Sequence, residues 1–343
     1  MKTELKNEII VFHPLNGFGG SQWMTSELIE VLSTHKNISK TKLYIGFGSK
    51  GFLKSRHILC KIENRFLRVL LLPYISLIFA IKTFFLRNKI IGVTTYSIYS
   101  LFFKALIFPK TVLFYFHEIP SSQVTLYLMK LLSIRRVQLI FVSNYHKNQC
   151  QIKGKVIYNF IKTDNIVQTK PPSKTLIFIG SASLKKGFDR FIDLCSRFEV
   201  EDEFEFIAYL NSIDRILVEK AKNLGVQINI GVTSKEIMFE KKGLLIQPSR
   251  AKETFSLVAL EAATWGIPIL HYGQEVLKEL LPKELLLSYN SDRSKLDIMN
   301  LLNNTQHYKE ISQKLRESAI HYTINEYERN IEKYIIQGFI NRN

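Results

Sequence analysis

Short apolar runs alternate with longer amphipathic stretches along both halves of this chain, and this alternation restricts the fold more than any other feature. It is typical of parallel strands joined by helices. Because 343 residues exceed the size at which one hydrophobic core stops growing, we expect two α/β domains. The runs that predict strands are 8–12, 43–47, 90–94 and 112–116 in the first half, and 176–179, 204–209, 228–230, 244–246 and 267–270 in the second.

A polar segment at 162–174, which ends in Pro171-Pro172, is the natural linker between the halves. We therefore predict a Rossmann-like domain at 1–165 and a second one at 166–325, facing each other across a cleft. Ligands of open α/β sheets bind beyond the carboxyl ends of the strands. We therefore expect the functional residues to lie where strands end.

The positive charge of the chain is concentrated in its first half. Residues 1–165 hold 23 Lys/Arg against 7 Asp/Glu, a charge of +16, whereas residues 166–343 hold 24 against 23. Such a field favours an anionic partner, whether nucleic acid, an acidic bilayer surface or a phosphorylated ligand. The three cysteines form no CxxC pair, which excludes a disulfide framework and a zinc knuckle and favours the cytosol.

The longest apolar stretch, 69–81, is too short to span a bilayer and is interrupted by Pro73. Acids within the first residues of the chain indicate no export signal. The stretch has basic flanks, which are typical of a helix lying in an anionic membrane surface. A buried core helix with solvated ends is the alternative, and the charge of the first half favours the membrane. The candidate lipid-contacting residues are Arg65, Arg68, Lys82, Arg87 and Lys89.

Two candidate sites follow strands of the first half. A glycine turn that includes Gly19 and Gly20 precedes a helix, where backbone amides favour a phosphate or carboxylate. It matches neither GxGxxG nor a P-loop, and a plain tight turn is the alternative. His117 comes directly after the strand at 112–116, which places it for polar or acid-base chemistry. A turn histidine satisfied by neighbouring carbonyls is its alternative.

Two further candidates lie in the second half. Lys186 stands beside a helix start, where its charge adds to the helix dipole and suits a diphosphate, unless it is merely solvated. Glu253 and Glu261 are eight residues apart, with the amides of Phe255, Ser256 and Leu257 at a helix start between them. Carboxylates accept hydroxyl hydrogen bonds and amides bind phosphate, so this segment describes a receptor for a nucleotide-sugar.

From the strand at Glu8 to the helix ending near Ile336, the sequence resembles the retaining glycosyltransferases of the GT-B fold, family 4. The most specific part is 248–269, in which Glu253 and Glu261 match the E-x7-E signature of that family. The glycine turn, the strand ending in HEIP and the GSASLKKGFD segment follow in the order of the family.

The resemblance implies a role for each matching residue. Gly19 and Gly20 correspond to the glycine loop near the donor phosphates and acceptor, and His117 to the histidine that orients a hydroxyl of the donor sugar. Lys186 would contact the diphosphate, Glu253 the transferred sugar and Glu261 the ribose. The segment 326–343 would be a C-terminal helix that returns to the N-terminal domain, and 230–235 would contact the base.

Two departures from the family pattern stand out. Ser181 occupies the position where the family usually has an arginine, which leaves the cationic clamp on the diphosphate incomplete unless Lys185 compensates. The junction 159–162 lacks the usual aspartate. A catalytically impaired family member, acting as a sugar-nucleotide-binding or interaction subunit, is therefore the alternative function.

The resemblance implies a metal-independent, retaining transfer from a nucleoside-diphosphate sugar, with no other cofactor. We expect a lipid-linked or other membrane-associated saccharide acceptor in bacterial O-antigen, capsule or lipopolysaccharide synthesis, and a cytoplasmic enzyme peripheral to the inner face of the plasma membrane. A nucleic-acid binder is disfavoured, because the sequence shows no basic recognition helix and no zinc-ligand spacing. An epimerase would need a dinucleotide fingerprint and phosphorylases are far longer chains, so both are disfavoured.

Overall fold

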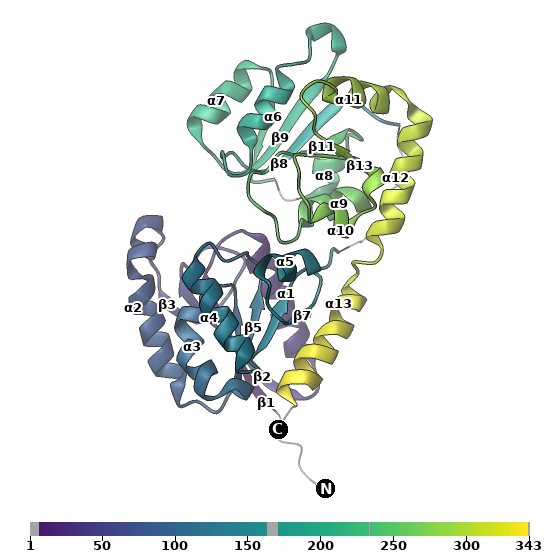
Figure 1. Cartoon of the computed structure of the whole chain (residues 1–343). Helices are drawn as coiled ribbons and strands as arrows, with labels where there is room; N and C mark the ends of the chain where they lie inside the picture. Colours follow the sequence, from purple (N-terminus) through teal and green to yellow (C-terminus); the bar gives the residue numbers. More distant parts are fainter. Residues whose placement is uncertain (1–6, 163–170, 233, 342–343) are drawn as a thin grey trace. The chain divides into compact units, whose positions relative to one another are not determined.

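The computed structural model describes residues 7–162, 171–232 and 234–341, which form two units (Figure 1). The first unit contains residues 1–159 and 325–343, and the second contains residues 160–324. The chain leaves the first unit at Asn159, inside the junction that departs from the family pattern. Most of the linker predicted at 162–174 lies outside the described residues.

The first unit is built on a seven-stranded sheet in the order β3-β2-β1-β4-β5-β6-β7, with every described pair parallel. All five residues of β5 are buried, as expected where helices cover both faces of a parallel sheet. The strands are β1 (Asn7–Leu15), β2 (Ile38–Phe47), β3 (His57–Cys60), β4 (Lys89–Val93), β5 (Val112–Phe116), β6 (Gln138–Phe141) and β7 (Lys155–Val156).

Aromatic side chains form much of the core between this sheet and its helices. Phe12 of β1 stacks on Phe79 of α2 with ring centroids 3.9 Å apart, and Phe114, Phe116 and Phe141 complete the layer. The helices are α1 (Gly20–Thr34), α2 (Arg65–Phe84), α3 (Ser97–Ile107), α4 (Gln123–Ile134) and α5 (Asn144–Cys150), with α13 (Ile324–Asn330) and the π-helix Ile331–Ile340 at the end of the chain.

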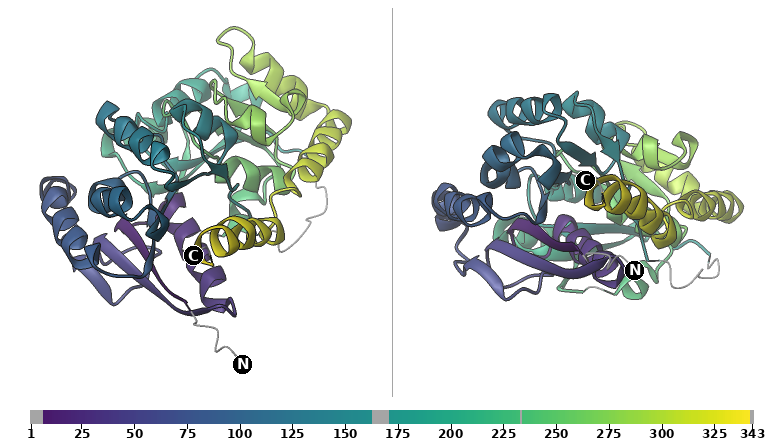
Figure 2. Two further views of the ribbon diagram at one scale, coloured as in Figure 1. Left: turned by 60° about the horizontal axis from the view of Figure 1, so that its bottom comes forward. Right: turned by 90° about the horizontal axis from the view of Figure 1, so that it is seen from below.

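The end of the chain packs onto the first unit. Gln138 Nε2 donates a hydrogen bond of 2.6 Å to the Tyr334 carbonyl, and His35 lies 2.8 Å from the Glu332 carboxylate. Tyr327, Ile335 and Phe339 are buried. Residues 325–343 are therefore an integral part of the first unit, at the side away from α2 (Figure 2).

The second unit has a six-stranded parallel sheet in the order β10-β9-β8-β11-β12-β13. Its strands are β8 (Thr175–Ser181), β9 (Glu205–Ser212), β10 (Gln227–Ile230), β11 (Leu244–Gln247), β12 (Ile269–His271) and β13 (Leu286–Ser288). Its helices are α6 (Phe188–Cys195), α7 (Arg215–Asn223), α8 (Lys235–Phe239), α9 (Leu257–Thr264), α10 (Leu277–Leu280), α11 (Ser294–Asn303) and α12 (Thr305–Ala319), with short 3-10 turns at Pro109–Thr111, Val200–Asp202 and Lys283–Leu285 in the two units.

The predicted α/β class with two parallel-sheet domains is confirmed. Pro73 interrupts the apolar stretch in the sequence but not the helix, because α2 continues through it. Burial of Ile75 and Phe79 just beyond the proline ties the helix to the sheet. This tertiary packing outweighs the one backbone hydrogen bond that a proline removes.

Candidate functional site

Lys186 and Glu253 meet in the second unit, although 67 residues separate them. Lys186 Nζ donates a hydrogen bond of 2.7 Å to Glu253 Oε1, and the Glu253 side chain is only 18% exposed. Lys186 lies in the turn between β8 and α6, and Glu253 in the loop between β11 and α9. The pair therefore joins two loops that follow neighbouring strands at the carboxyl edge of the sheet.

Close backbone contact fixes these two loops against each other. Gly187 has a φ of 73°, and a Cβ there would lie 2.0 Å from the Pro248 carbonyl oxygen, so only glycine fits. Arg250 forms two hydrogen bonds of 2.6 Å to the Asp189 carboxylate, which hold the pKa of that carboxyl below its ordinary value. These contacts hold together the two loops that carry Lys186 and Glu253, and we call them the base of the site.

Gln274 holds the loop from its other side. Its Nε2 donates to the Ser249 carbonyl at 2.6 Å, and its Oε1 accepts from the Glu253 amide at 3.4 Å. The backbone N–H of Gln274 in turn donates to His271 Nδ1 at 3.0 Å. Sequence patterns gave no signal for Gln274, because it lies on the loop after β12, outside the signature.

The start of α9 has no side-chain cap. Ser256 is its N-cap residue, but the Ser256 hydroxyl donates to Gln247 Oε1 at 3.1 Å instead of capping the helix. Phe255 and Ser256 are buried, and Leu257 is the first helical residue. A helix start without a side-chain cap provides backbone N–H groups and a positive dipole end, both of which suit an anion.

Glu261 lies on α9, one residue past its middle, and carries a second lysine partner. Lys235 Nζ at the start of α8 lies 2.7 Å from Glu261 Oε2. Burial raises the pKa of Glu261, whereas the Lys235 ammonium opposes that rise. Each acid of the signature is thus paired with a lysine from a different segment, Glu253 ahead of the start of α9 and Glu261 within the helix.

In the first unit, a buried asparagine holds the glycine turn. Asn16 Nδ2 donates to the Leu53 carbonyl at 3.0 Å, and its Oδ1 accepts from the amides of Gly17 and Leu53. The N-cap residue of α1 is Gly19, which has no side chain to cap the helix, and Gly20 is the first helical residue. The turn therefore sets a second uncapped helix start at the carboxyl end of β1.

His117 follows β5 in a cluster of three buried histidines. Burial and the nearby imidazoles of His13 and His146 lower the pKa of His117 to about 3, so it is neutral at physiological pH. His146 Nε2 contacts the Glu118 carbonyl at 3.0 Å and fixes the backbone beside His117. The neutral ring suits hydrogen bonding to a hydroxyl better than it suits proton removal.

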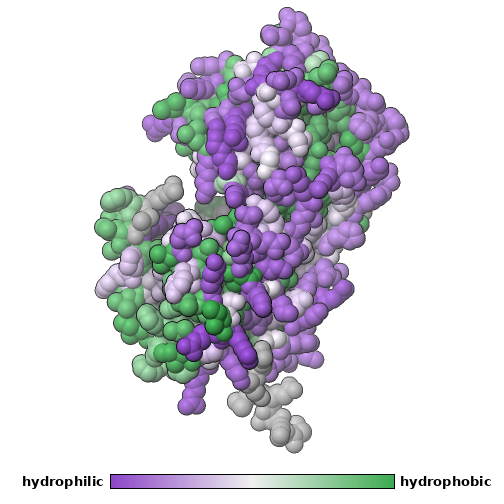
Figure 3. Space-filling view, in the orientation of Figure 1, coloured by the Kyte–Doolittle hydropathy of each residue, from purple (hydrophilic) through white to green (hydrophobic). Residues whose placement is uncertain are grey.

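The helix that contains the 69–81 stretch has an outward apolar stripe. Its side chains recur every three or four residues, at Phe66, Leu70, Tyr74, Leu77 and Ile81, and Leu70 and Ile81 are 64% and 66% exposed. The neighbouring helix α3 adds Phe103 and Ile107. We call these seven side chains the apolar face, and Figure 3 shows green surface where α2 and α3 lie.

The basic residues around the apolar face differ in their contacts. Arg68 pairs with Glu63 and donates from Nε to the Ile62 carbonyl at 2.7 Å. Lys89 donates to the Lys110 carbonyl at 2.8 Å. Both cations therefore have protein partners that compete with the lipid contact we predict. Lys82 and Arg87 are exposed, and the Arg65 side chain lies outside the described part.

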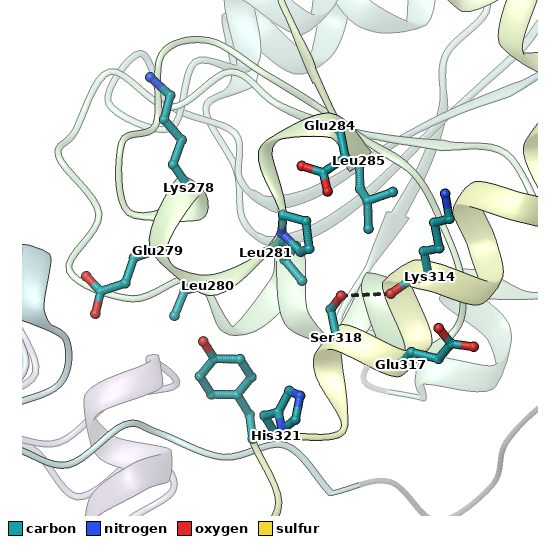
Figure 4. Close-up of a pocket in the computed structure, with 12 residues that line it drawn as sticks. Lys278, Glu279, Leu280, Leu281, Glu284, Leu285, Lys314, Glu317, Ser318 and His321 are labelled. Atoms are coloured by element: carbon teal, nitrogen blue, oxygen red, sulfur yellow. Dashed lines mark hydrogen bonds between the residues drawn. The ribbon is translucent and has the colours of Figure 1, made fainter.

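The predicted residues divide between the two units. Gly19, Gly20 and His117 belong to the first, whereas Lys186, Glu253, the start of α9 and Glu261 gather in the second. A cavity of about 610 Å³ also lies in the second unit, next to α10 and α12 (Figure 4). None of the predicted residues lines it, although Tyr322 in its wall packs edge-on against Phe255 with centroids 6.0 Å apart.

Residues 160–318 match the family described as glycosyl transferases group 1, so the second unit carries a domain of that family. A curated relative that matches is an uncharacterized 41.2 kDa protein in the cps region of Klebsiella pneumoniae, 24% identical over 203 residues. The match covers 52% of this chain and 56% of the relative, so the chain spans about half the length of that protein.

Solved glycosyltransferase structures share the fold over nearly the whole chain. The lipopolysaccharide outer core galactosyltransferase WaaB in its apo form has a TM-score of 0.66 and 15% identity, covering 97% of this chain and 99% of WaaB. Anabaena HepE in complex with UDP and glucose has a TM-score of 0.75 and 16% identity, covering 96% and 100%. These similarities confirm the predicted GT-B fold.

Proposed function

We propose that this chain is a retaining glycosyltransferase that moves a sugar from a nucleoside-diphosphate sugar to a lipid-linked or other membrane-associated saccharide in bacterial surface polysaccharide synthesis. One observation carries the proposal: two lysine–carboxylate pairs flank the uncapped start of α9. The matching relative from a cps region and the fold shared with WaaB support this polysaccharide context.

Each residue has a defined task in this proposal. Lys186 exchanges its contact with Glu253 for the diphosphate, and the amides at the start of α9 add partial positive charge there. Glu253, once released, accepts hydroxyl hydrogen bonds from the transferred sugar, and Glu261 accepts those of the ribose. Gly19 and Gly20 contribute backbone groups from the first unit, and neutral His117 orients a sugar hydroxyl.

The reaction breaks the bond between the anomeric carbon and the diphosphate oxygen. The bonding electron pair leaves with the nucleoside diphosphate, whose added charge Lys186 and the helix-start amides stabilise without a metal. The acceptor hydroxyl oxygen bonds to the anomeric carbon from the same face, so the configuration is retained. Its proton passes to the departing phosphate oxygen.

The membrane part of the proposal rests on the apolar face. A stripe of large apolar side chains at helical spacing, next to exposed Lys82 and Arg87, suits an interface whose headgroups are anionic. Across the ranges that the structure describes, no helix combines the length and the apolar content that crossing a bilayer requires. We propose that the enzyme is peripheral to the inner face of the plasma membrane, where a lipid-linked acceptor is within reach.

A calorimetric and thermal-shift screen of UDP-, GDP-, ADP- and CMP-sugars tests the donor site. We expect one nucleotide class to raise the melting temperature of the protein, because a ligand that binds only the folded state stabilises it. Glu253→Gln and Lys186→Met should weaken that shift, whereas Glu205→Gln, on an exposed pair with Lys241, should not. Absence of binding by every nucleotide class would contradict the proposal.

A catalytically impaired member that binds sugar nucleotides is the second candidate, because Ser181 stands where the family usually has an arginine. The Ser181 hydroxyl donates to Asn211 Oδ1 at 2.8 Å and supplies no positive charge. Turnover measured with the nucleotide-sugar found in the screen separates the two. Binding without turnover by the wild type, unchanged in Ser181→Arg, would favour the impaired member.

A further inference from the structure

Lys235, which has no role in the function proposed above, forms an ion pair with Glu261. Lys235 Nζ lies 2.7 Å from Glu261 Oε2, with the lysine side chain 36% exposed and the glutamate side chain 20% exposed. Glu261 Oε2 itself is buried, and no described group donates an aligned hydrogen bond to it. The contact is thus an ion pair by distance, in which the Lys235 ammonium lies against the buried Oε2.

An unfilled carboxylate acceptor that is buried is costly unless something compensates its charge. Protonation would remove the charge, but a protonated carboxyl has lost part of its acceptor capacity. The Lys235 ammonium provides this compensation at Oε2, and the ionised carboxylate keeps its acceptor capacity. It comes from α8, which follows β10, so the compensation depends on an element outside the signature helix.

We propose that Lys235 is a positioning residue that keeps Glu261 ionised and oriented, so that the Glu261 carboxylate accepts a hydroxyl of the nucleotide ribose. The inference rests on the proposed function, because it needs a nucleotide beside Glu261. Lys235 acts through Glu261 and need not touch the nucleotide itself.

Lys235 is the charged group that opposes the effect of burial on the pKa of Glu261, and among the residues that the structure describes no other charged partner contributes. The two lysines have different partners, because Lys186, the proposed diphosphate lysine, pairs with Glu253 and not with Glu261. Removing Lys235 should therefore change the ionisation of Glu261 and leave the Lys186–Glu253 pair intact.

The experiment follows the Glu261 carboxyl by carbon NMR in protein labelled at the glutamate side-chain carboxyl, with Glu261→Gln identifying the resonance. In Lys235→Met the titration midpoint of Glu261 should move to higher pH than in the wild type. Lys241→Met is the matched control, because Lys241 pairs with exposed Glu205 in the same unit. An identical Glu261 midpoint in the wild type and Lys235→Met overturns the proposal.

Binding of UDP-glucose, measured by calorimetry between about pH 8 and pH 5, is the second readout. Its diphosphate has no terminal monoester group, so it lacks the ionisation near pH 6 that such groups have. In Lys235→Met the affinity should fall by up to about tenfold for each pH unit below the raised midpoint, and more steeply than in the wild type. A uniform loss at all pH values would indicate direct contact and contradict the proposal.

The two readouts separate failure of this inference from failure of the proposed function. If Lys235→Met shifts the Glu261 midpoint but the wild type binds no nucleotide-sugar, the ion-pair part stands and the ribose part falls with the proposed function. If the wild type binds and Glu261→Gln abolishes the extra pH dependence of Lys235→Met, the proposal is supported in full.

Discussion

The two units treat charge in opposite ways. In the second unit, the candidate site is built from ionised groups in pairs, Lys186 with Glu253 and Lys235 with Glu261. In the first unit, the equivalent edge of the sheet holds His13, His117 and His146, all buried and neutral. Exposed cations such as Lys82 and Arg87 contribute to the cationic excess of that unit.

This difference implies a division of labour between the units. Paired ions can exchange partners with a charged ligand, which suits a site for a diphosphate and its sugar. Neutral imidazoles bind hydroxyls without drawing a counterion into the core. Similar sheets can thus carry different chemistry at their carboxyl edges, because the residues after the strands differ.

The largest expected effect is that acid destabilises the first unit more than the second. The pKa values of His13 and His117 are lowered to about 3 and that of His146 to about 4, so their neutral forms stabilise the folded state above pH 6.5. That contribution is lost as pH falls from 6.5 towards those values, by up to about 2 kcal/mol per histidine at pH 5. In the described part of the second unit, His271 is the one histidine with a lowered pKa.

The tryptophans allow each unit to be followed separately, since Trp23 lies in the first and Trp265 in the second. Urea unfolding of Trp265→Phe, followed by Trp23 fluorescence, should lose more stability between about pH 7 and pH 5 than unfolding of Trp23→Phe, followed by Trp265. Equal losses in both variants would show that the buried histidines do not distinguish the units.

Removing Lys186 should have the next largest effect. We expect Lys186→Met to lower turnover by about 10²- to 10³-fold, because an electrostatic contact with the leaving diphosphate is lost. Lys220→Met, at an exposed lysine on α7, is the control, and steady-state kinetics with the nucleotide-sugar identified in the screen is the measurement. Similar losses in the two variants would argue against a special role for the Lys186–Glu253 pair.

Replacing two exposed cations, Lys82 near the end of α2 and Arg87 just after it, tests the first unit. Lys82→Gln with Arg87→Gln should weaken binding to vesicles containing phosphatidylglycerol by about 30-fold, since each cation near an anionic surface contributes about 1 kcal/mol. The control is Lys220→Gln with Lys222→Gln on α7, and co-sedimentation at low salt is the measurement. Unchanged binding would remove α2 from the proposed membrane surface.

The smallest effect concerns the base of the second-unit site. Arg250→Lys replaces two hydrogen bonds to Asp189 by a point contact at a partly exposed position, which should cost about 1 kcal/mol of unfolding free energy. Urea unfolding followed by Trp265 measures it, with Arg215→Lys on α7 as the control. A loss equal to that of the control would mean that the loops do not depend on this pair.

Much of the fold could be predicted from the sequence, because apolar runs such as 112–116 mark strands buried on both faces. Lys186 and Glu253 could be found because they stand in loops that follow strands, and Glu261 because it comes eight residues after Glu253 in the signature. The lysine partner of Glu261 could not, since a strand and a helix start lie between the two residues and only their packing brings them together. The contacts of Arg68 and Lys89 likewise depend on neighbours that a count of charges does not identify.

The return of the chain to its first unit has a consequence for synthesis. Residues 160–324 form a contiguous unit, whereas the first unit lacks the buried side chains of Tyr327, Ile335 and Phe339 until these have left the ribosome. The second unit can therefore reach its native packing earlier, and a nascent chain exposes the surface of the first unit that these side chains cover until the end of the chain emerges.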